Sequence, residues 1–345
     1  MTSLKQLLLK PLLMPGFPAL LKYVQRDCAT VFMLHRFNDA ERGIAGCDVR
    51  HLRHALTYLA RNGYELVSLV ELFERLGGKG PQARGAVAFT IDDGYIEQAT
   101  VAAPIFAEFG CPVTTFVTTG FLDRKLLWFW WDQIEYIFQH AARRSAQVQL
   151  GGKVLDYRWE NQKQRSRAQD DFTAKCKVLP QAEKPAAIAQ LAHATDVEVP
   201  AAPPAAYAPM SWKQVRECEH MGMTFGPHTV THPVLSRSAN EVAAHEITES
   251  WARLRTEVRK PVPVFCYPYG WRADFGDREV AVLRRLGFLG ALAAEPGYAN
   301  ALSFRSNGDD RFKIPRFGFP DELPHLIQYV SGVERFKQLL RRTTQ

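Results

Sequence analysis

The chain has 345 residues, of which 46 % are hydrophobic and 23 % charged, and its formal net charge is +7. This is the composition of an ordinary globular protein with ample core, in one large domain or two of usual size. The sequence contains no run of about 18 uncharged apolar residues, which excludes a membrane-spanning helix. The six cysteines are scattered without a C-x-x-C pair, which argues against a zinc knuckle or a disulfide framework and favours a reducing compartment.

Residues 1–28 are predicted to form two short amphipathic helices. Residues 1–26 carry four basic residues and no acidic one. The helices either cover the bottom of the fold or lie on an anionic membrane face. Residues 7–14 are apolar like the core of a signal peptide, but Lys10 and Pro11 interrupt them and no small-x-small cleavage site follows. We therefore expect a cytoplasmic protein, with peripheral contact to the inner membrane as the alternative.

Strand-like runs then alternate with helical ones, which predicts an α/β protein with a parallel sheet. Ser211 and Asn240 are expected to cap the helices that follow them. The predicted strands are 29–34, 65–70, 85–91, 113–118, 224–226, 262–267, 288–293 and 313–317, and the predicted helices are 51–62, 99–109, 212–222, 241–258, 277–286 and a C-terminal helix within 321–345.

Residues 122–209 depart from this alternation. They open with Trp128, Trp130 and Trp131, continue as polar helix and close with a Pro/Ala-rich stretch. We interpret them as a largely helical insertion with a linker. The tryptophan cluster either stacks on sugar rings or packs the insertion, and we favour packing.

Two separated motifs carry the chemistry. Asp92 and Asp93 end one predicted strand, and His228 and His232 follow another. Two His four residues apart can face one point from a single turn. With one carboxylate they make three nitrogen and oxygen ligands, which suits a divalent metal that keeps a position open for water. The second carboxylate remains as a base, so the set can hydrolyse an amide or an ester.

Three motifs resemble those of the polysaccharide deacetylases with the nodulation-type deacetylase domain, carbohydrate esterase family 4. They are FTIDDGY at 89–95, GPHTVTHP at 226–233 and FCYPYG at 265–270. The resemblance covers residues 29–121 and 210–320. It implies a distorted (β/α)7 barrel that binds Zn²⁺ or another divalent ion such as Co²⁺ or Ni²⁺. In parallel barrels the active site lies at the carboxyl ends of the strands, where the candidate residues stand.

The resemblance also implies roles for individual residues. Asp92 is expected to be the general base, and the backbone N–H of Tyr269 is expected to help hold the oxyanion. Tyr95 and Trp271 are taken as substrate contacts. The expected metal ligands are Asp93, His228 and His232.

The chain departs from the family pattern in two places. Cys266 stands where many members have an Arg that pairs with the catalytic Asp, and Arg316 either supplies this charge or is a surface residue. No Leu-x-His for the general acid stands at the end of the last predicted strand, and the nearest one, Leu323-Pro324-His325, lies six residues further on. We expect His35 to be the acid, because it ends the first strand, and His325 is the other candidate.

The predicted function is metal-dependent removal of an acyl group, most simply acetyl, from an N-acylated sugar of a lipid-linked or nucleotide-linked precursor of a surface glycan. A deformylase or cyclic-amide hydrolase on the same scaffold is an alternative. A non-catalytic carbohydrate-binding module that kept the metal is another, although a pure binding site needs no Asp92. A nucleic-acid partner is not expected, because the sequence lacks a basic stripe with interleaved aromatic residues.

Overall fold

The computed structural model describes residues 27–335 except 127, 307 and 309, and these form two compact units. One unit comprises Met1–Asp123 and Pro209–Gln345, and the other comprises Arg124–Ala208. The amphipathic helices predicted for residues 1–28 fall almost entirely on 1–26, outside the described residues. Within the described part of the chain, no helix is long and apolar enough to cross a membrane.

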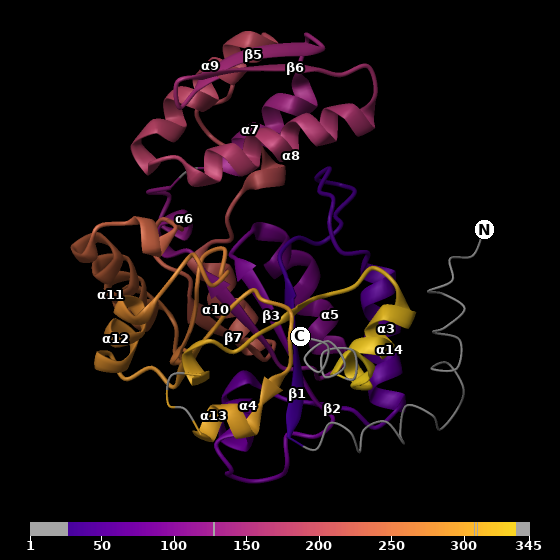
Figure 1. The fold of residues 1–345 in the computed structure, drawn as a ribbon. Coiled ribbons are helices and arrows are strands. Elements are labelled where there is room, and N and C mark those ends of the chain that lie inside the picture. The colour runs from indigo at the N-terminus through magenta and orange to yellow at the C-terminus, as the bar shows by residue number, and fades with distance from the viewer. Residues whose placement is uncertain (1–26, 127, 307, 309, 336–345) are drawn as a thin grey trace, which may run out of the picture. The chain divides into compact units, whose positions relative to one another are not determined.

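A parallel sheet runs through the middle of the first unit (Figure 1). Its strands run in the order β1 (Cys28–Leu34), β3 (Ala86–Asp93), β4 (Val113–Val117) and β7 (Met223–Pro227). All eight residues of β3 are buried, as expected for a parallel strand covered on both faces. The register places Asp93 opposite Val117, at the carboxyl ends of both strands.

Three shorter strands close this sheet into a ring. The backbone N–H of Val262 donates to the carbonyl of Phe225 at 2.7 Å and so joins β8 (Val264–Cys266) to β7. β8 pairs in parallel with β9 (Gly290–Leu292), which bridges to Ile314 just before β11 (Phe317–Gly318). β11 pairs in parallel with β1. Among the described residues the ring therefore has seven strands, and the predicted α/β class with a barrel-like sheet is confirmed.

Amphipathic helices surround the ring (Figure 1). α3 (Val49–Arg61), for example, buries Leu52, Leu56 and Leu59, which share one helical face. Two short strands, β2 (Glu65–Leu66) and β10 (Ala299–Asn300), pair with β3 and β1. The other helices of this unit are α4 (Leu69–Leu76), the π-helical turn Gln98–Ala102, α5 (Ala103–Glu108), α6 (Thr119–Leu122), α10 (Trp212–His220), α11 (Asn240–Glu257), α12 (Asp277–Arg285), α13 (Ala301–Ser306), α14 (Leu323–Val330) and the 3₁₀ turns Leu235–Arg237 and Asp310–Phe312.

Local predictions failed where a short apolar run was ambiguous. The strand predicted over 65–70 is only two residues long, and α4 begins at Leu69 because the Ser68 hydroxyl accepts from the backbone N–H of Glu71 at 3.2 Å. Ser211 caps α10 in a reciprocal capping box, as predicted. Asn240 is not a cap, since the helix N-cap position is Ala239.

The second unit holds three helices and a β-hairpin. Its helices are α7 (Trp130–His140), α8 (Gln162–Val178) and α9 (Lys184–Thr195), with short 3₁₀ turns at Gln181–Glu183 and Ala205–Tyr207. The hairpin joins β5 (Ser145–Leu150) to β6 (Lys153–Arg158) and was missed by the prediction of a largely helical insertion. Its signal was present: two glycines, both with positive φ, separate runs of alternating polarity.

The tryptophans of the second unit pack within it. Trp128 and Trp130 are 5 % and 8 % exposed. The ring of Trp128 stacks on Tyr207, and the ammonium group of Lys184 lies 4.7 Å from the ring centre of Trp130. Packing therefore accounts for these two side chains, and their burial leaves little ring surface for sugar stacking.

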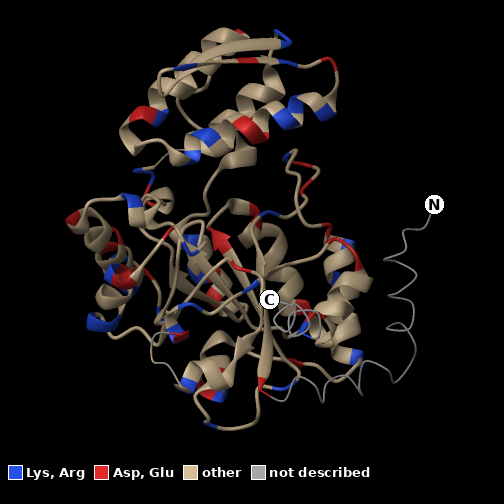
Figure 2. Ribbon diagram, viewed as in Figure 1, with Lys and Arg blue, Asp and Glu red and all other residues tan. Residues whose placement is uncertain are grey.

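Charged residues of both signs are interspersed along the helices of each unit, as Figure 2 shows. The described residues carry basic and acidic side chains in nearly equal number, because residues 1–26 and 336–345 hold seven basic residues and no acidic one.

Candidate active site

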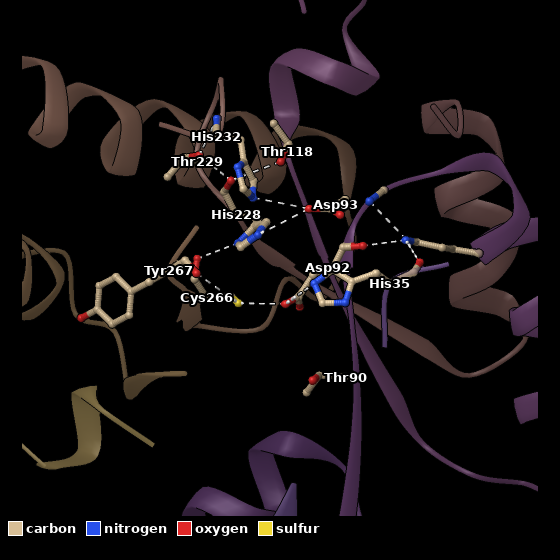
Figure 3. A network of polar contacts seen from close by, with 12 residues as sticks. His35, Thr90, Asp92, Asp93, Thr118, His228, Thr229, His232, Cys266 and Tyr267 are labelled. Carbon is tan, nitrogen blue, oxygen red and sulfur yellow. Dashed lines mark hydrogen bonds and ion pairs between the residues drawn. The ribbon is translucent and has the colours of Figure 1, made fainter. Parts of the chain in front are cut away.

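His35, Asp92, Asp93, His228 and His232 come together at the carboxyl ends of the barrel strands (Figure 3). Asp92 and Asp93 end β3, and His35 follows β1. His228 follows β7, while Arg316 immediately precedes β11. The parallel arrangement brings these ends together, although the residues are far apart in the sequence.

Asp93, His228 and His232 form a compact group of possible metal ligands. The Nε2 atoms of His228 and His232 lie 3.7 and 3.5 Å from Oδ1 of Asp93. The ligand atoms of the three side chains all lie within 4.8 Å of one another, and all three side chains are buried. Two imidazole nitrogens and one carboxylate oxygen facing one point suit a divalent cation such as Zn²⁺.

The backbone around this group is held in an unfavourable conformation. Asp93, Thr229, His232 and Tyr269 have φ angles of 86°, 67°, 59° and 60°. Residues with a Cβ rarely adopt positive φ, and each such residue costs on the order of 1–3 kcal/mol. Strain concentrated at one point of a fold is typical of functional sites, because the surrounding structure must impose it.

Both imidazoles are prepared for ligation. Nδ1 of His228 lies 2.8 Å from the carbonyl oxygen of Cys266, and because a carbonyl only accepts, Nδ1 carries the hydrogen and Nε2 keeps its lone pair. Burial lowers the pKa of His228 to about 4, against the opposing charge of Asp92. Burial, followed by the neighbouring His228, holds the pKa of His232 well below its usual range. Both rings are therefore neutral at neutral pH.

Arg316 forms a buried ion pair with Asp92. Its two terminal nitrogens donate to Oδ1 and Oδ2 of Asp92 at 2.9 and 2.8 Å. Its Nε donates to the carbonyl of Ala293 at 3.0 Å, and one terminal nitrogen also reaches the Thr90 hydroxyl at 3.0 Å. Burial is the largest single effect and raises the pKa of Asp92, but the charge and hydrogen bonds of Arg316, together with the charges of His228 and His35, outweigh it and hold that pKa well below its usual range.

Cys266 occupies the space beside this pair. Its Sγ lies 3.6 Å from Oδ2 of Asp92 and 3.2 Å from a terminal nitrogen of Arg316. Burial raises the pKa of Cys266 well above its usual range, so the group is a neutral thiol that donates to the carboxylate. The guanidinium beside Asp92 thus comes from Arg316, just before β11, and position 266 of the third motif holds only a small side chain.

His35 lies on the solvent side of Asp92. Its Nε2 is 3.8 Å from Oδ2 of Asp92, and its side chain is 45 % exposed. The other candidate acid, His325, lies on α14, where its Nδ1 is 3.8 Å from Glu322 and its side chain is 44 % exposed. Of the two candidate acids, only His35 lies beside the Asp92 carboxylate in the contacts described.

The remaining predicted residues differ in position. The ring centre of Tyr269 lies 4.9 Å from that of His232. Trp271, two residues further on, is 50 % exposed. Tyr95 is 1 % exposed, and the guanidinium carbon of Arg36 lies 3.9 Å from the centre of the Tyr95 ring. The prediction that Tyr95 contacts substrate is therefore not supported by its position, because its buried ring offers no open surface.

One family model matches part of the chain. The model of the family described as polysaccharide deacetylase matches residues 169–290, which include the His228–His232 motif and the third motif. Over these residues the chain is similar to the polysaccharide deacetylases. Members of that family are hydrolases that act on the amide bonds of sugar N-acetyl groups, the class predicted from the sequence. No curated protein sequence gives a significant match.

Solved structures of similar fold include a deacetylase and a de-N-acetylase. The Streptococcus pyogenes deacetylase PplD, solved with acetate, is 18 % identical over 88 % of this chain and 98 % of its own, with a TM-score of 0.56. IcaB from Ammonifex degensii is 19 % identical over 89 % and 98 %, with a TM-score of 0.54. A de-N-acetylase from Aggregatibacter actinomycetemcomitans is 15 % identical over 86 % and 96 %, with a TM-score of 0.51. At these identities the similarity supports the shared fold.

One buried residue of this deacetylase-family site escaped the sequence analysis. The side-chain amide of Gln98 donates to the carbonyls of His35 and Asp92 at 2.7 and 2.6 Å and accepts from the N–H of Gly94 at 3.2 Å. It begins a π-helical turn, an element frequent at functional sites. No sequence signal marks it, because its partners are backbone groups that only the fold brings within reach.

Proposed function

We propose that this chain is a metal-dependent deacetylase that removes the N-acetyl group from an amino sugar of a surface glycan or its precursor. The observation that carries the proposal is that a set of possible metal ligands lies next to a separate carboxylate that can act as a base. Asp93, His228 and His232 converge as neutral or anionic ligands. Asp92, the next residue, is held as a carboxylate by Arg316 and does not belong to that triad.

Asp93, His228 and His232 would hold the ion. A divalent cation in such a set lowers the pKa of a water molecule toward about 7 and polarises the substrate carbonyl. Zn²⁺, Co²⁺ and Ni²⁺ all suit two imidazoles and one carboxylate.

The other residues divide the proton transfers between them. Asp92, ionised at neutral pH, accepts the proton of the attacking water. Oxygen adds to the carbonyl carbon, and the backbone N–H of Tyr269 donates to the developing oxyanion. His35, on the open side of Asp92, donates a proton to the departing nitrogen as the carbon–nitrogen bond breaks. The products are acetate and the free amino sugar, which accounts for every atom of the water.

The substrate class rests on the site and on its relatives. PplD was solved with acetate, and the Aggregatibacter protein is a de-N-acetylase. Both support an acetyl group, and the second supports an amide. The lipid-linked or nucleotide-linked substrate, the membrane contact of residues 1–28 and the cytoplasmic location stay predictions.

The direct test is incubation of the metal-loaded protein with oligomers of N-acetylated amino sugars, followed by mass spectrometry and assay of released acetate. We expect loss of one acetyl per reaction, strongly reduced turnover by Asp92→Asn and no reaction after chelation. N-formyl and O-acetyl sugars are assayed in parallel. Turnover of the formyl sugar alone would favour the deformylase alternative, and inert parent protein on every substrate would refute the proposed enzyme.

A further inference from the structure

The loop of residues 228–232, which carries both histidines, is hydrogen-bonded on one side to α6. The backbone N–H groups of Thr119 and Gly120 donate to the carbonyls of Thr229 and Val230 at 3.1 and 2.9 Å. A Cβ on Gly120 would lie 2.5 Å from the Val230 oxygen, so only glycine permits this close approach. The carbonyl groups of the loop are thus satisfied from one side.

Glu246 of α11 satisfies the amides of the same loop. Its Oε2 accepts from the backbone N–H groups of Val230 and Thr231, both at 2.8 Å, and its Oε1 accepts from the Thr231 hydroxyl at 2.6 Å. The residue is 6 % exposed. Hydrogen bonds to an ionised carboxylate are roughly twice as strong as neutral ones. Three of them converge on a stretch of only two residues.

The loop needs such support because its backbone is strained. Thr229 and His232 have φ angles of 67° and 59°, and the N–H of His232 donates to the Thr229 hydroxyl at 3.0 Å. If the contacts at Val230 and Thr231 were lost, both strained residues could relax to negative φ, and this rotation would move the imidazoles away from Asp93.

The other end of the same α11 face is anchored to the end of α6. Arg253, two helical turns after Glu246, donates to both carboxylate oxygens of Asp123, which immediately follows α6. The indole N–H of Trp212 donates to the same carboxylate at 2.7 Å. The two elements that hold the loop are therefore joined to each other and can keep their spacing.

We propose that Glu246 is a positioning residue that holds the His228–His232 loop in the conformation that binds a divalent cation. Glu246 acts on the ligands through the backbone of Val230 and Thr231 and touches neither imidazole in the contacts described. The proposal rests on the proposed function, since it presumes the cation site of Asp93 and the two histidines.

The test measures metal affinity, which needs no substrate. Glu246→Gln keeps the size of the side chain but turns one acceptor oxygen into a donor. We expect its dissociation constant for Co²⁺, measured by chelator competition and by the absorption of the bound ion, to rise by roughly 10- to 100-fold, as for other residues that orient metal ligands. Glu219→Gln is the matched control. Glu219 also accepts from two successive backbone N–H groups, those of Arg259 and Lys260, but in the loop that precedes β8.

Unchanged Co²⁺ affinity in Glu246→Gln, or equal losses in Glu246→Gln and Glu219→Gln, would overturn the proposal. If Glu246→Gln does not fold, Thr231→Val decides, because it removes only one of the three bonds. We then expect a smaller loss of affinity with normal thermal stability, and unaltered affinity overturns the proposal. Parent protein that binds no Co²⁺ would instead refute the cation site, so the two failures are distinguishable.

Discussion

The Arg316 guanidinium and the Asp92 carboxylate face each other in a buried, two-point ion pair, with N···O distances of 2.9 and 2.8 Å. Asp92 lies in β3 and Arg316 immediately precedes β11, 224 residues further along the chain. The pair fixes the carboxylate in orientation as well as in charge, because both of its oxygens are held. Four predictions follow from this relationship and from the residues around it.

Replacing Asp92 by Asn should abolish the base without disturbing the ligand group. Asn keeps the shape of the side chain but cannot accept the proton of water, so we expect turnover to fall by a factor on the order of 10²–10⁴. Bound metal, measured by elemental analysis, should remain near one per chain. Turnover close to that of the parent would remove Asp92 from the mechanism.

Replacing Arg316 by Met should affect both stability and pH dependence. Removing one member of a buried pair costs about 3–5 kcal/mol, measured by urea unfolding at neutral pH. The lowered pKa of Asp92 contributes stability above its unfolded value of 3.8, and this is lost as pH falls through the lower folded value. Without Arg316, burial dominates, the Asp92 pKa rises and the acid limb of the pH–rate profile should move to higher pH.

Arg278→Met is the control for this experiment. Arg278 also pairs with a buried carboxylate, that of Glu279. Its loss should lower stability and leave the acid limb in place. An acid limb that does not move in Arg316→Met would contradict the assigned pairing.

Replacing His35 by Ala should slow protonation of the leaving amine. A general acid sets the alkaline limb of a pH–rate profile, and the variant should lose this limb. His325→Ala serves as the comparison, because it removes the other candidate acid from an exposed helix. If the limb disappears in His325→Ala and persists in His35→Ala, the two roles are reversed.

Acid should destabilise the chelator-treated protein through its buried histidines. An unfolded His takes up a proton below about pH 6.5, but folded His228 resists it until about pH 4. The unfolded state therefore binds more protons in this window, so the free energy of unfolding falls as pH falls from 6.5 to 4. His228 contributes about 3 kcal/mol to this loss, from about 1.4 kcal/mol per pKa unit.

His228→Asn should flatten the pH dependence of urea unfolding over that window. The exposed His220, replaced in the same way, should leave the slope as in the parent. An identical slope in His228→Asn would show that the ring is protonated in the folded state and is unsuited as a ligand at weakly acidic pH.

The sequence was sufficient for the parts of this protein that depend on short-range patterns. The motif at 89–95 and the spacing of His228 and His232 predicted a ligand set, because carboxylate and imidazole have few other reasons to gather at the ends of buried strands. The alternation of strands and helices predicted the α/β class. The prediction missed α4 and the hairpin of 145–158, because intrinsic propensity does not decide between helix and strand in such short segments.

Only the tertiary structure decided which long-range partners complete the site. Arg316 was an open choice between a buried pair and a surface residue, and closure of the ring between β11 and β1 places it against Asp92. Gln98 and Glu246 act on backbone groups of distant loops and so leave no mark in their own sequence neighbourhood. The sequence shows which side chains can bind a metal ion. Where these side chains point depends on strained backbone conformations at Asp93 and His232, which the rest of the fold must stabilise.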